Sequence, residues 1–286
     1  MDWGGGASFF HYDRLSPKDR CSSHAYATKQ RNYLTDSSSF CICVSYNYLW
    51  FRKWLTQNQE YTFGFMGREN WYRNTSWNDE IDSAFRERLN RSRQLFHKAQ
   101  YLRIQGNILL SSKDISSQEV GISLMKELLN DYPDNKAVIF SKFEAYVNLG
   151  DYYYYTQEKL DLAFECYKNA IAYDESMTTG QWHAVMAYIK TAVLTKHEED
   201  YPDCYSRLEK ADDRLVFPHE YYELGLSGAL LYDAMGHYDA AKASASIALK
   251  ALGTDSPFKR GDKVYGKASA TEAELLFLTS VVYRKS

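Results

Sequence analysis

One run of four residues, His197 to Asp200, combines an imidazole with three carboxylates in the sequence His-Glu-Glu-Asp. Imidazole and carboxylate groups are common ligands of divalent cations. Consecutive residues on a turn point in different directions, however, and the sequence identifies no partner ligands elsewhere. We therefore predict no metal site.

The sequence also lacks the local motifs that mark common enzymes. It has no phosphate-binding loop, no Gly-x-Gly-x-x-Gly, no Gly-x-Ser-x-Gly and no His-Glu-x-x-His. Its five cysteines include no Cys-x-x-Cys pair, which fits reduced thiols in the cytoplasm. We predict no catalytic residues, no cofactor and a cytoplasmic location. An enzyme, or an enzyme subunit, whose site is assembled only in three dimensions is the alternative from another class.

Composition places the chain among ordinary soluble proteins. Of its 286 residues, 45% are hydrophobic and 25% are charged, and the net charge is −3. This balance gives no reason to expect nucleic acid as a partner. The most apolar run, residues 40–51, is much shorter than the ~20 residues of a membrane-spanning helix, so we predict no membrane span.

The first part of the chain differs from the remainder. Residues 1–65 hold three of the five cysteines and show no sustained helical periodicity. We expect residues 1–65 to be a poorly ordered or spurious N-terminal extension, with Met66 a possible true start; a small separate domain is the alternative. Residues 66–286 are expected to form one helical repeat domain.

From Trp77 onward, apolar residues recur at helical spacing. Ile81, Phe85 and Leu89 are four residues apart, which predicts a first helix from about Trp77 to Leu95. Four helix pairs are then expected, followed by a last helix over 269–283. The pairs span residues 98–133, 136–173, 180–218 and 220–251.

The second pair carries the most informative pattern. Ala163, Tyr167 and Ala170 alternate small and aromatic side chains at helical spacing. We interpret Gly150 as the turn between the two helices of this pair, and residues 153–160 as about two additional helical turns inserted before Ala163. Gly236 is expected to form the equivalent turn in the fourth pair.

These pairs resemble tetratricopeptide repeats over about residues 77–284. The resemblance implies an all-α solenoid of about four imperfect helix pairs, with an extra N-terminal helix and a C-terminal capping helix. It also implies a protein or peptide ligand in a concave groove that the first helix of each pair lines. The expected function is therefore that of an adaptor or scaffold, and a peptide-sensing bacterial regulator is the alternative within this class.

The motif mapping also predicts which side chains line that groove. Relatives that bind chaperone tails hold a terminal carboxylate with basic and Asn residues, but the matching positions here are Leu102, Gly106 and Ser141, so that ligand class is not expected. The predicted groove residues are Phe140, Glu144, Asn148, His183, Lys190, Glu223, Leu226 and Asp233.

Overall fold

A computed structural model describes residues 70–174, 182–210, 215–256, 259–260 and 263–284. The expectation about residues 1–65 lies outside this part of the chain. The described elements are helices, apart from one short antiparallel hairpin in which Lys259 pairs with Val264. This hairpin lies between the fourth expected helix pair and the expected last helix. None of the described helices is both long and apolar enough to cross a membrane.

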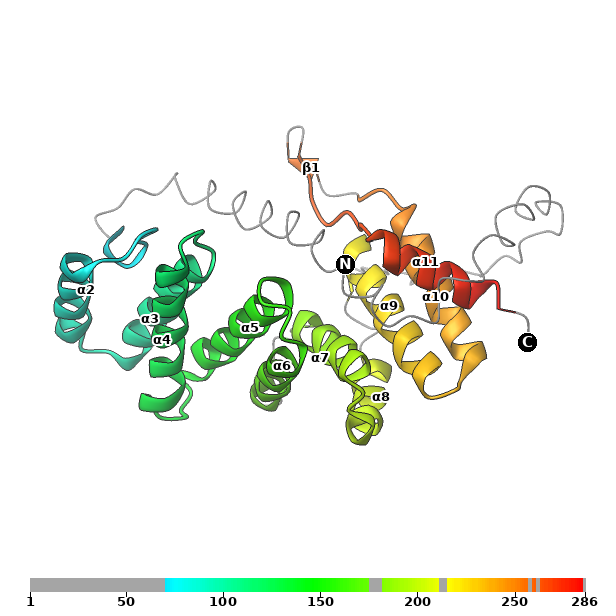
Figure 1. Cartoon of the computed structure of the whole chain (residues 1–286), viewed down its shortest axis with the longest axis horizontal. Helices are drawn as coiled ribbons and strands as arrows, with labels where there is room; N and C mark the ends of the chain where they lie inside the picture. Colours follow the sequence, from blue (N-terminus) through cyan, green and yellow to red (C-terminus); the bar gives the residue numbers. More distant parts are fainter. Residues whose placement is uncertain (1–69, 175–181, 211–214, 257–258, 261–262, 285–286) are drawn as a thin grey trace, which may run out of the picture. The chain divides into compact units, whose positions relative to one another are not determined.

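The elements follow one another in the order that Figure 1 labels. They are η3 (Asn70–Tyr72), α2 (Asp79–Arg91), α3 (Leu95–Leu110), α4 (Ile115–Asp131), α5 (Ile139–Tyr155), α6 (Leu160–Asp174), α7 (Trp182–Thr195), η4 (Glu198–Asp200), α8 (Tyr201–Glu209), α9 (Pro218–Ala234), α10 (Tyr238–Leu252), β1 (Lys259–Arg260), β2 (Lys263–Val264) and α11 (Glu272–Val282).

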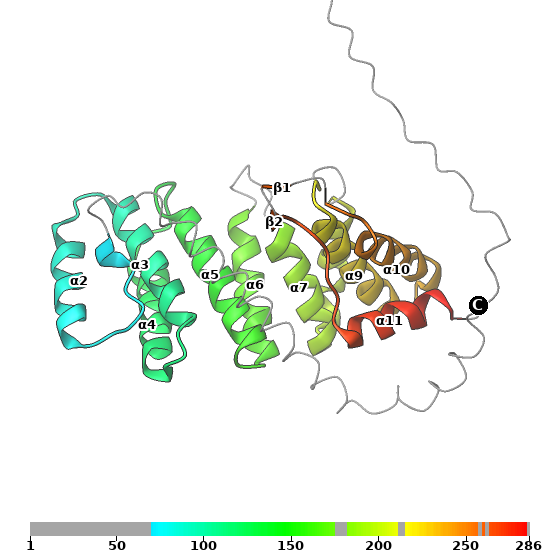
Figure 2. The same ribbon diagram turned by 90° about the horizontal axis from the view of Figure 1, so that it is seen from above.

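The helices pack in consecutive pairs. Helix α3 lies against α4, α5 against α6, α7 against α8, and α9 against α10. Helix α11 covers both members of the last pair, and α3 packs on α5 as α7 packs on α9. Figures 1 and 2 show α5 beside α6 and α9 beside α10. The arrangement confirms the predicted all-α, solenoid-like class, with α2 before the pairs and α11 after them.

The first predicted helix is shorter than expected at both ends. Asn78, rather than an earlier residue, caps α2, because its side chain accepts a hydrogen bond from the amide of Ile81. At the other end Ser92 takes an extended conformation, with φ −66° and ψ 125°, which ends the helix at Arg91. The predicted helix from Trp77 to Leu95 therefore contains a break before α3.

Gly150 is not a turn. Helix α5 continues to Tyr155, so the predicted turn and the inserted helical turns after it were wrong. The glycine is needed because the ring of Tyr167 from α6 packs directly on it. A Cβ atom at position 150 would lie 2.6 Å from a carbon of that ring. The small residue therefore allows the two helices of the pair to approach closely.

A residue in the left-handed region follows the first helix of each of the last three pairs. These residues are Glu158 after α5, Lys196 after α7 and Gly236 after α9, with φ of 52°, 59° and 77°. After α7 and α9, the next amide donates to the carbonyl five residues earlier, which is the Schellman pattern of a helix end. The predicted turn at Gly236 is thus correct, while Glu158 and Lys196 adopt the same conformation without glycine.

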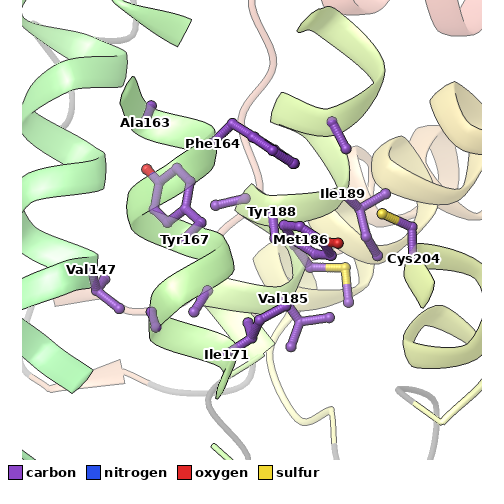
Figure 3. Packing of buried hydrophobic residues seen from close by; sticks show 14 of the residues in the cluster. Val147, Ala163, Phe164, Tyr167, Ile171, Val185, Met186, Tyr188, Ile189 and Cys204 are labelled. Carbon is purple, nitrogen blue, oxygen red and sulfur yellow. The ribbon is translucent and has the colours of Figure 1, made fainter. Parts of the chain in front are cut away.

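The central core joins buried residues of α5, α6, α7, α8 and α9, and Figure 3 shows part of it. Phe164 of α6 stacks on Tyr188 of α7, Tyr167 of α6 packs on α5, and Ile189 of α7 and Cys204 of α8 belong to the same cluster. All five side chains are almost completely buried. Two further clusters bury the helices before and after this one. Packing between pairs, as well as within them, therefore holds the described helices together.

The contact between α5 and α6 gives a direct test of this packing. Gly150→Ala should lower the free energy of unfolding by about 1–3 kcal/mol, because the added methyl group meets the buried ring of Tyr167. The control is Gly253→Ala, where the nearest atom is 3.7 Å from the added Cβ and the backbone φ is −85°. Urea unfolding followed by circular dichroism measures both. Equal effects of the two changes would contradict the proposed close contact.

Candidate functional site

The predicted groove residues all lie on the first helices of the pairs. Phe140, Glu144 and Asn148 are on α5, His183 and Lys190 are on α7, and Glu223, Leu226 and Asp233 are on α9. Their surroundings differ, however, and only some of them belong together.

One ion pair bridges each successive pair of first helices. We call the charged residues of these bridges the polar row. The bridges are Arg103–Glu144 between α3 and α5 (3.5 Å), Asp151–His183 between α5 and α7 (3.2 Å), and Lys190–Glu223 between α7 and α9 (2.6 Å). The sequence predicted four of these residues and missed Arg103 and Asp151.

The Lys190–Glu223 pair is the most deeply placed bridge. The Lys190 side chain is 8% exposed and that of Glu223 is 31% exposed. Burial by itself lowers the pKa of Lys190, but the groups that face it, with the carboxylate of Glu223 first among them, together outweigh burial, and the pKa lies well above its usual value. For Glu223, burial raises the pKa, but the charge and hydrogen bond of Lys190, together with nearby histidines, lower it below its usual value. Both groups are therefore charged when paired.

Asp151 connects the second bridge to the core. Its carboxylate accepts a hydrogen bond of 2.7 Å from the hydroxyl of Tyr167 and pairs with Nε2 of His183. Its side chain is 10% exposed, whereas that of His183 is 52% exposed. Burial lowers the pKa of His183, but the charge of Asp151 and the hydrogen bond to it raise the pKa above its usual value. The bridge thus favours a protonated imidazole.

The Arg103–Glu144 bridge is longer than the other two, and two nitrogen atoms near it have no hydrogen-bond acceptor among the described residues. Nη1 of Arg103 is 3.5 Å from Glu144, and the guanidinium carbon is 5.8 Å from the centroid of the Phe140 ring. Burial lowers the pKa of Arg103, and Glu144 only partly offsets this. Nε of Arg103 and Nδ2 of Asn148 are buried and have no acceptor among the described residues.

Two predicted groove residues lie elsewhere. Leu226 is 1% exposed and packs in the core between α9 and α10, so its assignment to a binding surface was wrong. Asp233 pairs with Arg284, whose guanidinium lies over the ring of Tyr238. These three residues line an open hollow of about 1420 Å³ beside the α9–α10 turn. Asp233 therefore belongs to a different surface from the polar row.

The positions compared with chaperone-tail binders are also buried. Leu102 is fully buried in the first core cluster, Gly106 packs against Met125, and Ser141 is 2% exposed. None of these positions reaches a surface from which it can touch a ligand. Their residue types therefore carry no information about the ligand, and the mapping that placed them in the groove was wrong.

The acidic run near His197 does converge, contrary to the sequence-based expectation. Ligand atoms of His197, Glu199 and Asp200 lie within 4.8 Å of one another. The carboxylate of Asp200 already pairs with the ammonium group of Lys168 at 2.8 Å and accepts a hydrogen bond from the hydroxyl of Tyr188 at 3.1 Å. The described contacts thus explain the cluster as an ion-pair network that joins α6 to the α7–α8 connection.

Comparison with known proteins found no family model, no curated protein and no solved structure that matches this chain. The function is therefore inferred from the geometry of the polar row.

The Lys190–Glu223 bridge predicts strong coupling between its residues. Lys190→Met should lower the free energy of unfolding by about 3 kcal/mol, because it leaves the largely buried carboxylate of Glu223 unpaired. Adding Glu223→Leu should recover most of that loss. Urea unfolding of both single variants and the double variant gives the coupling energy. The control Lys242→Met, at an exposed position on α10, should change stability by no more than about 0.5 kcal/mol. Additive effects at positions 190 and 223 would contradict the bridge.

The Asp151–His183 bridge predicts a pH-dependent contribution to stability. Because the pKa of His183 is raised on folding, its contribution is fully present below the unfolded value of about 6.5 and is lost as the pH rises through the folded pKa. Wild type should therefore exceed His183→Gln in stability by more at about pH 5.5 than at about pH 8.5. Urea midpoints at both values measure this gap. In an Asp151→Asn background the gap should close, and a gap that is independent of pH would refute the bridge.

Proposed function

We propose that this chain is a binding scaffold that holds a protein or peptide partner along the polar row. The observation that carries the proposal is the placement of its charges. Charged side chains usually extend into solvent, where pairing contributes little. Here every successive pair of first helices is joined by an ion pair, and several members are largely buried. Such pinned groups present hydrogen-bonding atoms at fixed spacing, which lowers the entropy lost on binding.

Exposed side chains beside the row supply the remaining contacts of a binding surface. Phe140 is 42% exposed and lies next to Arg103, and His183 is about half exposed. Tyr154, at the end of α5, is partly buried, and burial raises the pKa of its hydroxyl. Aromatic groups combined with fixed polar groups are typical of protein interfaces. The partner we propose therefore makes both apolar and polar contacts.

A cytoplasmic setting belongs to the same proposal. Cys166 and Cys204 are free thiols, and burial raises the pKa of each to about 12. Thiols with such a pKa are poor nucleophiles at neutral pH, and free thiols suit a reducing compartment.

The proposal is tested by selecting ligands from a random library, which requires no assumption about the identity of the partner. A phage library that displays random dodecapeptides is panned on the immobilised full chain, and selected peptides are synthesised for titration. We expect saturable binding that weakens at least about tenfold in the triple variant Phe140→Ala, Glu144→Ala, His183→Ala. These side chains line α5 and α7 and are partly exposed, so circular dichroism should confirm that the variant folds.

A matched control lies on a second helix. Leu162→Ala, Glu165→Ala and Asn169→Ala change three exposed residues of α6 and should leave the affinity unaltered. Failure to select any peptide that binds saturably would refute the proposal. Equal binding to both triple variants would refute the assignment of the site to the first helices.

A further inference from the structure

An open hollow of about 1420 Å³ lies beside the turn between α9 and α10, on a different surface from the polar row. Tyr205, Tyr232 and Tyr238 line it with aromatic rings, and Asp233 and Asp239 line it with carboxylates. The centroids of the Tyr205 and Tyr232 rings are 5.9 Å apart. A concave surface that combines aromatic walls with a few polar groups has the usual composition of a binding site.

A side chain of the chain itself already occupies part of the hollow. Arg284 follows α11, and its guanidinium group pairs with both carboxylate oxygens of Asp233. Nη1 donates to Oδ1, and Nη2 donates to Oδ2 at 3.3 Å. The guanidinium carbon also lies 4.9 Å from the centroid of the Tyr238 ring. A carboxylate that accepts from both ends of the guanidinium fork, beside an aromatic ring, is an arrangement by which proteins recognise arginine.

The chemistry of Asp233 and Tyr238 favours a guanidinium group over other ligands. The hydrogen bond to Asp233 raises the pKa of Arg284 above its usual value, so the contact favours a cation. The same carboxylate repels an anion. An ammonium group carries the charge but lacks the planar fork that reaches two oxygens while it stacks on a ring. The contact with Arg284 therefore identifies the ligand class that this position accepts.

All three side chains of this contact can be reached from solvent. The side chains of Arg284 and Asp233 are 39% and 23% exposed, and Tyr238 is 58% exposed. The hollow beside them is open and provides a path of approach. An external guanidinium group can therefore reach Asp233 and Tyr238 without any rearrangement of the core.

The position of Arg284 allows it to leave the contact. Helix α11 ends at Val282, and the amide of Arg284 donates a long hydrogen bond of 3.4 Å to the carbonyl of Val281. The ends of helices open more readily than their interiors, and exposed ion pairs contribute little to stability. Val281 is 3% exposed and keeps the helix packed when residue 284 moves.

We propose that Asp233 and Tyr238 form a binding site for an arginine side chain of a partner protein, and that Arg284 occupies this site in the free chain. The partner's arginine displaces Arg284, and the residues that flank it cover the rings of Tyr205 and Tyr232. A tethered group competes at a high effective concentration. The site therefore selects partners whose flanking residues also contact the hollow, and it acts independently of the peptide site proposed on the polar row.

The test follows the ring of Tyr238 by nuclear magnetic resonance of the full chain with ¹³C in its tyrosine rings. Tyr238→Phe assigns the signal. The probe is the pentapeptide Ala-Phe-Arg-Phe-Ala, acetylated and amidated so that arginine carries its only charge. A second peptide with citrulline in place of arginine keeps the shape and removes the charge. We expect saturable shifts with the arginine peptide and none with the citrulline peptide.

Variants distinguish a binding site from a simple attachment of α11. Arg284→Ala should tighten binding of the arginine peptide at least about fivefold, because no internal group then competes for the site. Adding Asp233→Asn should weaken that binding at least about tenfold. The matched change is Asp239→Asn, a second carboxylate of the same hollow, and it should alter the affinity by no more than about twofold. Circular dichroism checks the fold of each variant, and Arg284→Gln repeats the first measurement with a longer side chain.

Each of four results would overturn the proposal. Equal or weaker binding to both variants at position 284 would show that Arg284 does not occupy the partner's site. Equal binding of the citrulline peptide would exclude recognition of the guanidinium group. Equal losses in Asp233→Asn and Asp239→Asn would show attraction by overall charge alone. No saturable shift in any variant would remove the site and leave the proposal for the polar row unaffected.

Discussion

The hydrogen bond from Tyr167 to Asp151 links the core of this protein to its charged surface. Tyr167 packs on Gly150, and its hydroxyl reaches the carboxylate one residue further along α5. A carboxylate that is only 10% exposed needs partners to offset its lost hydration, and Tyr167 and His183 supply them from α6 and α7. One side chain of α6 therefore fixes how closely α5 and α6 approach and also orients the bridge to α7.

The same use of partly buried charge occurs at the joint before α5. The ammonium group of Lys142, on a side chain that is 4% exposed, donates to the carbonyl of Leu129 at the end of α4 and to Asp134. Asp134 also accepts from the hydroxyl of Tyr173 on α6. Apolar burial supplies most of the driving force for packing but is not directional. Hydrogen bonds to buried charged groups form only in a few relative positions of the helices. We therefore infer that they help to fix how each helix pair is aligned with the next.

The helical class, the pairing of helices and most helix positions followed from periodicity, because a buried face recurs with the helical period whatever lies opposite. The positions of the turns could not be predicted from periodicity. Gly150 and Gly236 look alike in sequence, yet the first serves a close contact and only the second adopts a left-handed conformation. Glu158 and Lys196 adopt that conformation without any local signal. Asp151 was missed because the residue before it, Gly150, was interpreted as a turn, and Arg103 was missed because its partner lies on another pair.

The wrong assignment of Leu226 on α9 has a physical cause. Counting from a motif identifies one face of a helix, but α9 packs against α7, α8, α10 and α11, so little of its surface is left for a ligand. Leu226 is buried for this reason. Next to Glu223, Tyr222 of α9 donates a hydrogen bond to Glu274 of the last helix, α11. Glu274 also accepts hydrogen bonds from the amide and hydroxyl of Thr271, the residue that caps α11. The carboxylate of Glu274 thereby stabilises the N-terminus of α11 and also attaches α11 to α9. Helix α11 therefore lies where the first helix of a further pair would lie, and the polar row ends at Glu223.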